Sequence, residues 1–66
     1  MLYTVAEVAR HIKVPEADLV DFAISRDIKY KIFIEHGEAK VISRYVNELV
    51  ADFKREQAED REVSNG

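Results

Sequence analysis

The sequence predicts a small α+β fold in the order helix, helix, β-hairpin, helix. Residues 3–28 hold two stretches with apolar residues at helical spacing, joined by a short break. Residues 30–42 then alternate and are rich in strand-forming side chains, and a further amphipathic stretch begins at Ser43. A chain of 66 residues has room for one domain. We expect this domain to cover 1–56 and to be followed by an acidic, frayed C-terminal tail at 57–66.

Thr4 and Glu7 mark the start of the first predicted helix. A threonine followed three residues later by glutamate is the signature of a capping box, in which the two residues satisfy the free N–H groups of the first turn. The apolar positions then recur at helical spacing through Val5, Val8, Ala9 and Ile12. Lys13 and Val14 form the break that follows.

Pro15 opens the second predicted helix, which covers about residues 15–26. Proline is tolerated there because the first turn of a helix does not use the missing N–H. We expect the two helices to meet in an apolar seam formed by Ala9, Ile12, Val14, Leu19 and Phe22. The opposite side of the second helix should therefore face water.

His36 and Gly37 are the predicted two-residue turn of the hairpin, since glycine accepts a positive φ. This turn would pair Glu35 with Glu38, Ile34 with Ala39, Phe33 with Lys40, and Ile32 with Val41. One hairpin face then suits the core: Ile32, Ile34, Ala39 and Val41. Ser43 is expected to cap the last helix, whose apolar stripe is Val46, Leu49, Val50 and Phe53.

The composition argues against several classes of function. The chain has no cysteine and a formal net charge of −3, so neither a thiolate metal site nor a general excess of basic residues is present. The sequence contains no Gly-rich phosphate loop, nucleophile motif or metal-ligand array. We therefore expect a cytoplasmic, non-enzymatic protein with no cofactor, catalytic residue or small-molecule substrate. No apolar run is long enough for a membrane span.

From Thr4 to about Phe53 the chain resembles the MerR-like and excisionase-like winged helix-turn-helix domains. The matching parts are the opening TVAEVARHIKV, a second helix that ends near Ile28, the hairpin in the place of the wing, and the capped closing helix. In that family the second helix enters the major groove of DNA. The resemblance implies an accessory or regulatory factor in transcription or DNA recombination, with duplex DNA as its partner.

Two groups of residues are candidates for contact with such partners. Basic residues around an aromatic side chain can bind a phosphate backbone, and the group here is Lys29, Lys31, Phe33, Lys40 and Arg44, with Arg10, Lys13 and Arg26 beside it. The outward positions of the second helix form the other group: Asp18, Val20, Asp21 and Ile24. Carboxylates around exposed aliphatic side chains suit a protein interface with a polar rim.

Two functions are consistent with these patterns. In the first, favoured by the resemblance, the protein binds DNA weakly through backbone contacts, by cooperative assembly or as a homo-oligomer. In the second, favoured by the charges, the same scaffold is a protein-binding module or inhibitor that uses the second helix to bind a partner protein. Two carboxylates on that helix would oppose the approach of phosphates.

Overall fold

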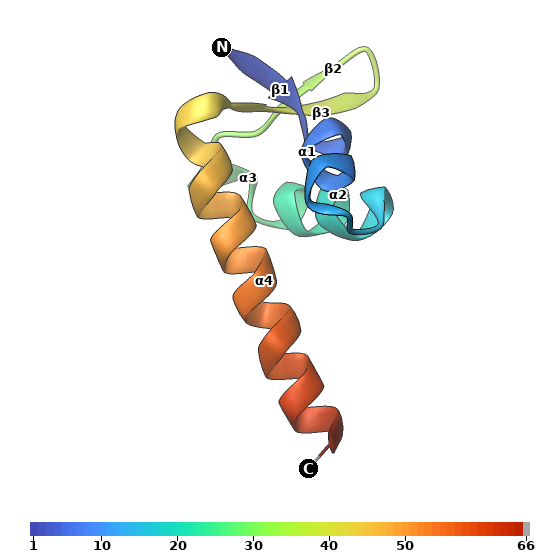
Figure 1. Ribbon diagram of the computed structural model, residues 1–66. Helices are drawn as coiled ribbons and strands as arrows, with labels where there is room; N and C mark the ends of the chain where they lie inside the picture. The colour runs from blue at the N-terminus through green and yellow to red at the C-terminus, as the bar shows by residue number, and fades with distance from the viewer. Residues whose placement is uncertain (66) are drawn as a thin grey trace.

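The computed structural model describes the backbone of residues 1–65 and the side chains of residues 1–59, and within this range it is a small α+β structure of four helices and three strands (Figure 1). The elements are β1 (Leu2–Thr4), α1 (Val5–Ile12), α2 (Glu16–Ser25), α3 (Asp27–Tyr30), β2 (Phe33–Glu35), β3 (Glu38–Ile42) and α4 (Ser43–Asn65). The α+β class and the order helix, helix, hairpin, helix are confirmed. The strand β1 and the short helix α3 were not predicted.

Thr4 is confirmed as the N-cap residue of α1, whereas the Glu7 carboxylate binds the Thr4 hydroxyl instead of the Thr4 N–H that a capping box would use. Thr4 Oγ1 accepts a hydrogen bond of 3.1 Å from the Glu7 N–H and donates one of 3.0 Å to Glu7 Oε1. The helix ends at Ile12, and the next residue, Lys13, is its C-cap and adopts a left-handed conformation with φ 62°. The Val14 N–H then reaches back to the Ala9 carbonyl at 3.0 Å, so the chain turns sharply before α2 begins.

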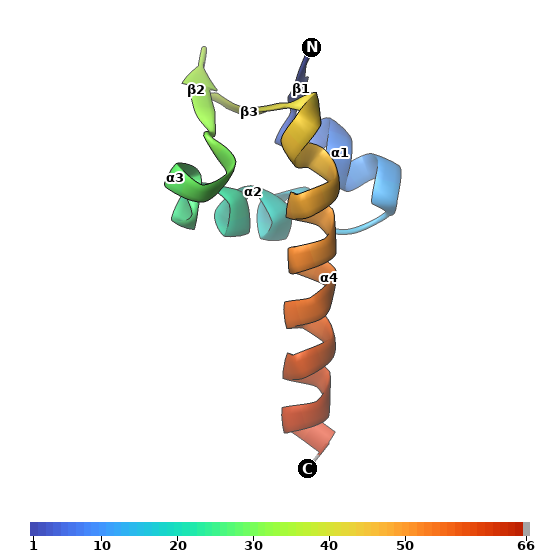
Figure 2. The same ribbon diagram turned by 90° about the vertical axis from the view of Figure 1, so that its left-hand side faces the viewer.

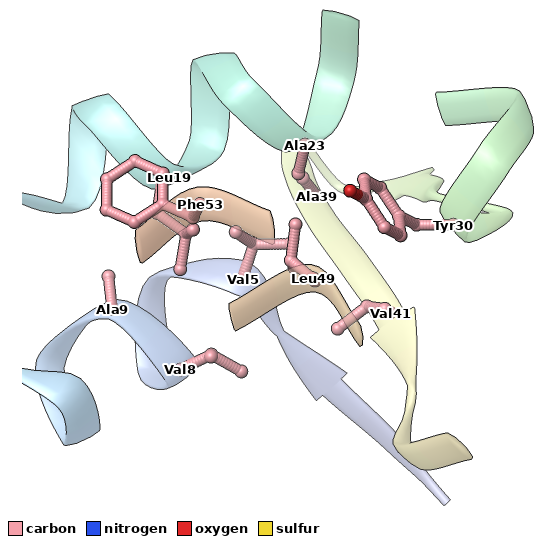
Figure 3. Packing of buried hydrophobic residues seen from close by; sticks show 10 residues of the cluster. All are labelled: Val5, Val8, Ala9, Leu19, Ala23, Tyr30, Ala39, Val41, Leu49 and Phe53. Atoms are coloured by element: carbon pink, nitrogen blue, oxygen red, sulfur yellow. The ribbon is translucent and has the colours of Figure 1, made fainter. Parts of the chain in front are cut away.

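The apolar seam between α1 and α2 is also confirmed. Ala9 and Leu19 are fully buried, while Ile12 and Val14 are partly buried against the same core. Phe22 is also partly buried, but its ring contacts Tyr30 of α3 and Phe53 of α4. Figure 3 shows the side chains that meet in this core, which come from α1, α2, α3, β3 and α4. Small residues such as Ala9 and Ala23 let the helix backbones approach closely. The outer side of α2 is consequently left at the surface.

The three strands form an antiparallel sheet in the order β1-β3-β2. The turn is as predicted, with positive φ at His36 (53°) and Gly37 (76°). The predicted pairs of Glu35 with Glu38, Ile34 with Ala39, and Phe33 with Lys40 are all present. The fourth predicted pair lies outside the ladder, because β2 begins at Phe33. On the other edge, Tyr3 pairs with Val41.

One core prediction for the hairpin was wrong. Ile34 was expected to be buried with its pairing partner Ala39, but 63% of Ile34 is exposed whereas only 8% of Ala39 is. The reason is that β2 is an edge strand and Ile34 lies one residue from the end of its ladder. Ala39 lies on the central strand β3, which α1 and α4 contact, and it belongs to the buried core.

The helix α4 is the longest element and extends well beyond the rest of the structure (Figures 1 and 2). Leu49 and Phe53 are buried, and Val46 and Val50 are partly buried against the core, which matches the predicted stripe. The backbone of the segment predicted as a frayed tail is helical as far as Asn65. Among the residues described, no helix is both long and apolar enough to cross a membrane.

Candidate functional site

A nearly buried carboxylate joins α3 to α4. Asp52 is 7% exposed and accepts hydrogen bonds of 2.6 Å from the Tyr30 hydroxyl and 2.8 Å from Lys29 Nζ. Its other oxygen accepts one of 2.8 Å from Arg55. The hydrogen bonds from Lys29 and then Tyr30 lower the pKa of Asp52 from 3.8 to about 2. Burial, and then the bond to Asp52, raise the pKa of Tyr30. We call these four residues the Asp52 cluster.

Arg26 makes a second connection between α2 and α4. Its Nη2 donates to both carboxylate oxygens of Glu56, at 2.8 and 3.1 Å. The guanidinium also lies over the Phe22 ring, 4.0 Å from the centroid, and Phe22 contacts Phe53 edge to face at 5.3 Å between centroids. The charged group of Arg26 is therefore held toward α4.

The outer side of α2 and α3 keeps acidic and aliphatic side chains as a result. Asp18 and Asp21 are exposed, and neither makes an ion pair with any side chain of residues 1–59. Ile24 is 43% exposed and Ile28 is 90% exposed. We call Asp18, Asp21, Ile24 and Ile28 the acidic–apolar face. It offers carboxylates that can hold ammonium or guanidinium groups, and aliphatic side chains that can exclude water from them.

The sequence prediction of this face differs from the structure at two positions. Val20 was included, but it is partly buried and packs against the core, so it is not part of the exposed surface. Ile28, which is 90% exposed, was not included in the predicted face. Ile28 lies on α3, beyond the break at Arg26, so the helical spacing of the second helix does not extend to it, and its exposure is a property of the tertiary structure.

The basic residues predicted to contact nucleic acid are distributed over several elements, and four of their seven cationic groups are bound to carboxylates. The pairs are Arg10–Glu16 at 3.7 Å, Arg26–Glu56 at 2.8 Å, Lys29–Asp52 at 2.8 Å and Lys40–Glu35 at 2.9 Å. The hydrogen bond to Glu35 raises the pKa of Lys40. A cation whose charge is already balanced contributes less to neutralising phosphates.

The remaining three cations, Lys13, Lys31 and Arg44, have no carboxylate partner among the side chains of residues 1–59. Lys31 ends α3 in a left-handed conformation with φ 53°, so it does not alternate with the residues of β2 as predicted. Phe33 and Lys40 do face each other across the ladder, and Phe33 is 48% exposed. Arg44 lies near the ring of Tyr45, 5.5 Å from its centroid.

A groove of about 650 Å³ lies between α1 and α4 and was not predicted. Its walls are mainly apolar and include Val8, Ile12, Val46 and Val50, and Tyr3 of β1 also borders it. The groove is separate from the acidic–apolar face, since its lining contains no residue of α2 or α3. The lining of the groove contains no group of unpaired carboxylates like Asp18 and Asp21 of the acidic–apolar face.

Comparisons of the chain with protein-family models, with curated proteins and with solved structures give no significant match.

Proposed function

We propose that this chain is a non-enzymatic protein-binding module on a winged helix-turn-helix scaffold, and that the acidic–apolar face binds the partner protein. The observation that carries the proposal is the difference between two neighbouring side chains. The charge of Lys29, whose side chain is 50% exposed, is paired with Asp52 of α4 at 2.8 Å, whereas the apolar side chain of Ile28 is 90% exposed. A large aliphatic side chain held at the surface beside carboxylates is typical of an interface centre with a polar rim.

The free energy available from this face is sufficient for a specific but modest interaction. Complete burial of an exposed isoleucine side chain is worth about 1.5–3 kcal/mol. Ile28, at 90% exposed, offers nearly all of this, and Ile24, at 43% exposed, offers less than half. The ion pair of Arg26 and the Asp52 cluster hold α2 and α3 in place before binding. Less conformational entropy is then lost when a partner docks.

Duplex DNA is a second candidate partner, and one observation favours it. Lys13, Lys31 and Arg44 have no carboxylate partner among the side chains of residues 1–59, so they are the cations best able to contact phosphates. The resemblance to MerR-like and excisionase-like domains supports the same function. Against it, the helix that would enter the major groove carries Asp18 and Asp21.

A photo-crosslinking experiment tests the protein-binding function. A benzophenone amino acid replaces Ile28 in one sample and Glu59, an exposed residue on the far part of α4, in a control sample. We expect a discrete adduct with one protein from position 28 only. That protein, once purified, should bind the unmodified chain, and Ile28→Ala should weaken the binding about tenfold, which corresponds to about 1.4 kcal/mol. Equal adducts from both positions, or unchanged affinity of Ile28→Ala, would overturn the proposal.

A further inference from the structure

We infer that the occupant of the acidic–apolar face is a cationic amphipathic helix of the partner protein. This inference rests on the proposed protein-binding function and adds the chemical class of the segment that docks. Three properties of the face lead to it: the balance of its charges, the spacing of its aliphatic groups, and the state of its backbone hydrogen bonds.

The charge argument begins with the carboxylates that lack a partner. Asp18, Asp21 and Asp27 all lie on α2 and α3, all are exposed, and none pairs with a cation among the side chains of residues 1–59. The two cations on the same stretch, Arg26 and Lys29, are held by Glu56 and Asp52 of α4. Within α2 and α3 the charges of Asp18, Asp21 and Asp27 are therefore left unpaired, and lysine or arginine side chains of a partner complement them.

The aliphatic groups restrict the occupant further. Ile24 follows Asp21 by one turn of α2, Ile28 directly follows Asp27 in α3, and both isoleucines are exposed. A purely cationic segment would leave both isoleucines in water. An occupant that contacts the whole face needs apolar side chains in its centre and cationic side chains at its borders, so it is amphipathic.

The hydrogen-bonded backbone of α2 favours a helical occupant over an extended one. The N–H and C=O groups within a helix bond to each other, so the face offers side chains and no strand edge for an extended peptide to pair with. An occupant that buries its apolar side against this surface must satisfy its own backbone groups. An amphipathic helix does so. The ten residues of α2 span about 15 Å, which corresponds to a contact of two to three turns on the occupant.

Titration with synthetic peptides, followed by amide chemical shifts of the full-length ¹⁵N-labelled chain, tests this inference. The first probe is a helical peptide with leucine on one side and lysine on the other. The second probe replaces each lysine with glutamate, and the third has the residues of the first in an order that destroys the amphipathic pattern. We expect the leucine–lysine helix to shift amides of α2 and α3, with a Kd on the order of 10–100 µM for so small a contact.

Matched variants separate charge from packing. Asp18→Asn with Asp21→Asn keeps the size of both side chains and should weaken binding of the leucine–lysine helix about tenfold, whereas Glu59→Gln should leave it unchanged. Retained dispersion of the amide spectrum shows that each variant is folded. An unchanged affinity of the double variant would refute the charge argument.

The other outcomes distinguish this inference from the function on which it rests. If the leucine–glutamate helix binds α2 and α3 as tightly as the leucine–lysine helix, the proposed class of occupant is wrong and protein binding at the face still stands. If the leucine–lysine helix shifts only residues of the groove between α1 and α4, or no probe shifts α2 and α3, the inference fails. The crosslinking experiment at position 28 reports on the protein-binding function independently. Concentration-dependent shifts without any peptide would identify a second copy of the chain as the occupant and would also overturn the inference.

Discussion

The Tyr30 hydroxyl donates a hydrogen bond of 2.6 Å to Asp52 Oδ2, and this bond fixes the orientation of α3 against α4. The Tyr30 side chain is fully buried, so α3 has a defined inner side. Ile28, two residues earlier, is then directed to solvent. The contact between Tyr30 and Asp52 thus connects the packing of the core with the presentation of the acidic–apolar face.

Removal of this hydrogen bond should destabilise the fold. Tyr30→Phe keeps the buried ring and deletes only the hydroxyl, and we expect the Tm to fall by roughly 4–8 °C, the shift that corresponds to the loss of about 1 kcal/mol in a domain of this size. Asp52→Ala should lower the Tm further, because Lys29 and Tyr30 both lose their partner. Thermal melts followed by circular dichroism measure both. A Tyr30→Phe protein that melts at the wild-type temperature would show that the bond contributes nothing.

The lowered pKa of Asp52 predicts a loss of stability in acid. The hydrogen bonds from Lys29 and Tyr30 lower this pKa from 3.8 to about 2 in the folded state. A group with a lowered folded-state pKa stabilises the protein above its unfolded-state pKa, and that contribution is lost as the pH falls toward the folded-state value. Urea unfolding should therefore show a free energy of unfolding that decreases between pH 3.8 and about pH 2. The decrease should be smaller in Asp52→Asn, and an equal decrease in both proteins would contradict the assignment.

Two substitutions to alanine separate the core from the acidic–apolar face. Leu49 is fully buried, so Leu49→Ala should lower the free energy of unfolding by about 2–5 kcal/mol through lost burial and a residual cavity. Ile28 is 90% exposed, so Ile28→Ala should change it by no more than about 0.5 kcal/mol. Chemical denaturation at neutral pH compares the two. A large loss of stability in Ile28→Ala would mean that this side chain has a structural role, and the argument for the acidic–apolar face would fail.

The helices and the hairpin register could be predicted because they depend on local signals. The capping pair of Thr4 and Glu7, and the turn at His36 and Gly37, act over a few neighbouring residues. Their effect is therefore visible in the sequence. The strand β1 could not be found in the same way, since its three residues become a strand only by pairing with β3, nearly 40 positions later. The register of that pairing is a property of the tertiary structure.

The candidate site could be predicted only in part, for a similar reason. Asp18, Asp21 and Ile24 were identified correctly as surface residues from helical spacing. The partners of Arg26 and Lys29 lie on α4, 30 and 23 positions away, and no local pattern indicates those ion pairs. Without them, both cations looked available for phosphate contact. The ion pairs to α4 balance the charges of Arg26 and Lys29 and leave Asp18, Asp21 and Asp27 as the unpaired charges of α2 and α3 among the side chains of residues 1–59.

Reversal of one charge on α2 should separate the two candidate partners. Asp21 is exposed and unpaired among the side chains of residues 1–59, so Asp21→Lys should preserve the fold. If a cationic protein segment binds the acidic–apolar face, this variant should weaken that binding about tenfold or more, because a repulsive pair replaces an attractive one. If duplex DNA binds α2, the same change should strengthen binding.

Glu59→Lys is the control for this comparison, because it alters the net charge by the same amount on the far part of α4. Fluorescence anisotropy at low salt measures both ligands, with a labelled leucine–lysine helix and a labelled DNA duplex. We expect Asp21→Lys to differ from Glu59→Lys with the peptide and to resemble it with DNA, where both act only through net charge. Tighter DNA binding by Asp21→Lys alone, with no effect on the peptide, would assign α2 to the major groove and would exclude the protein-binding function.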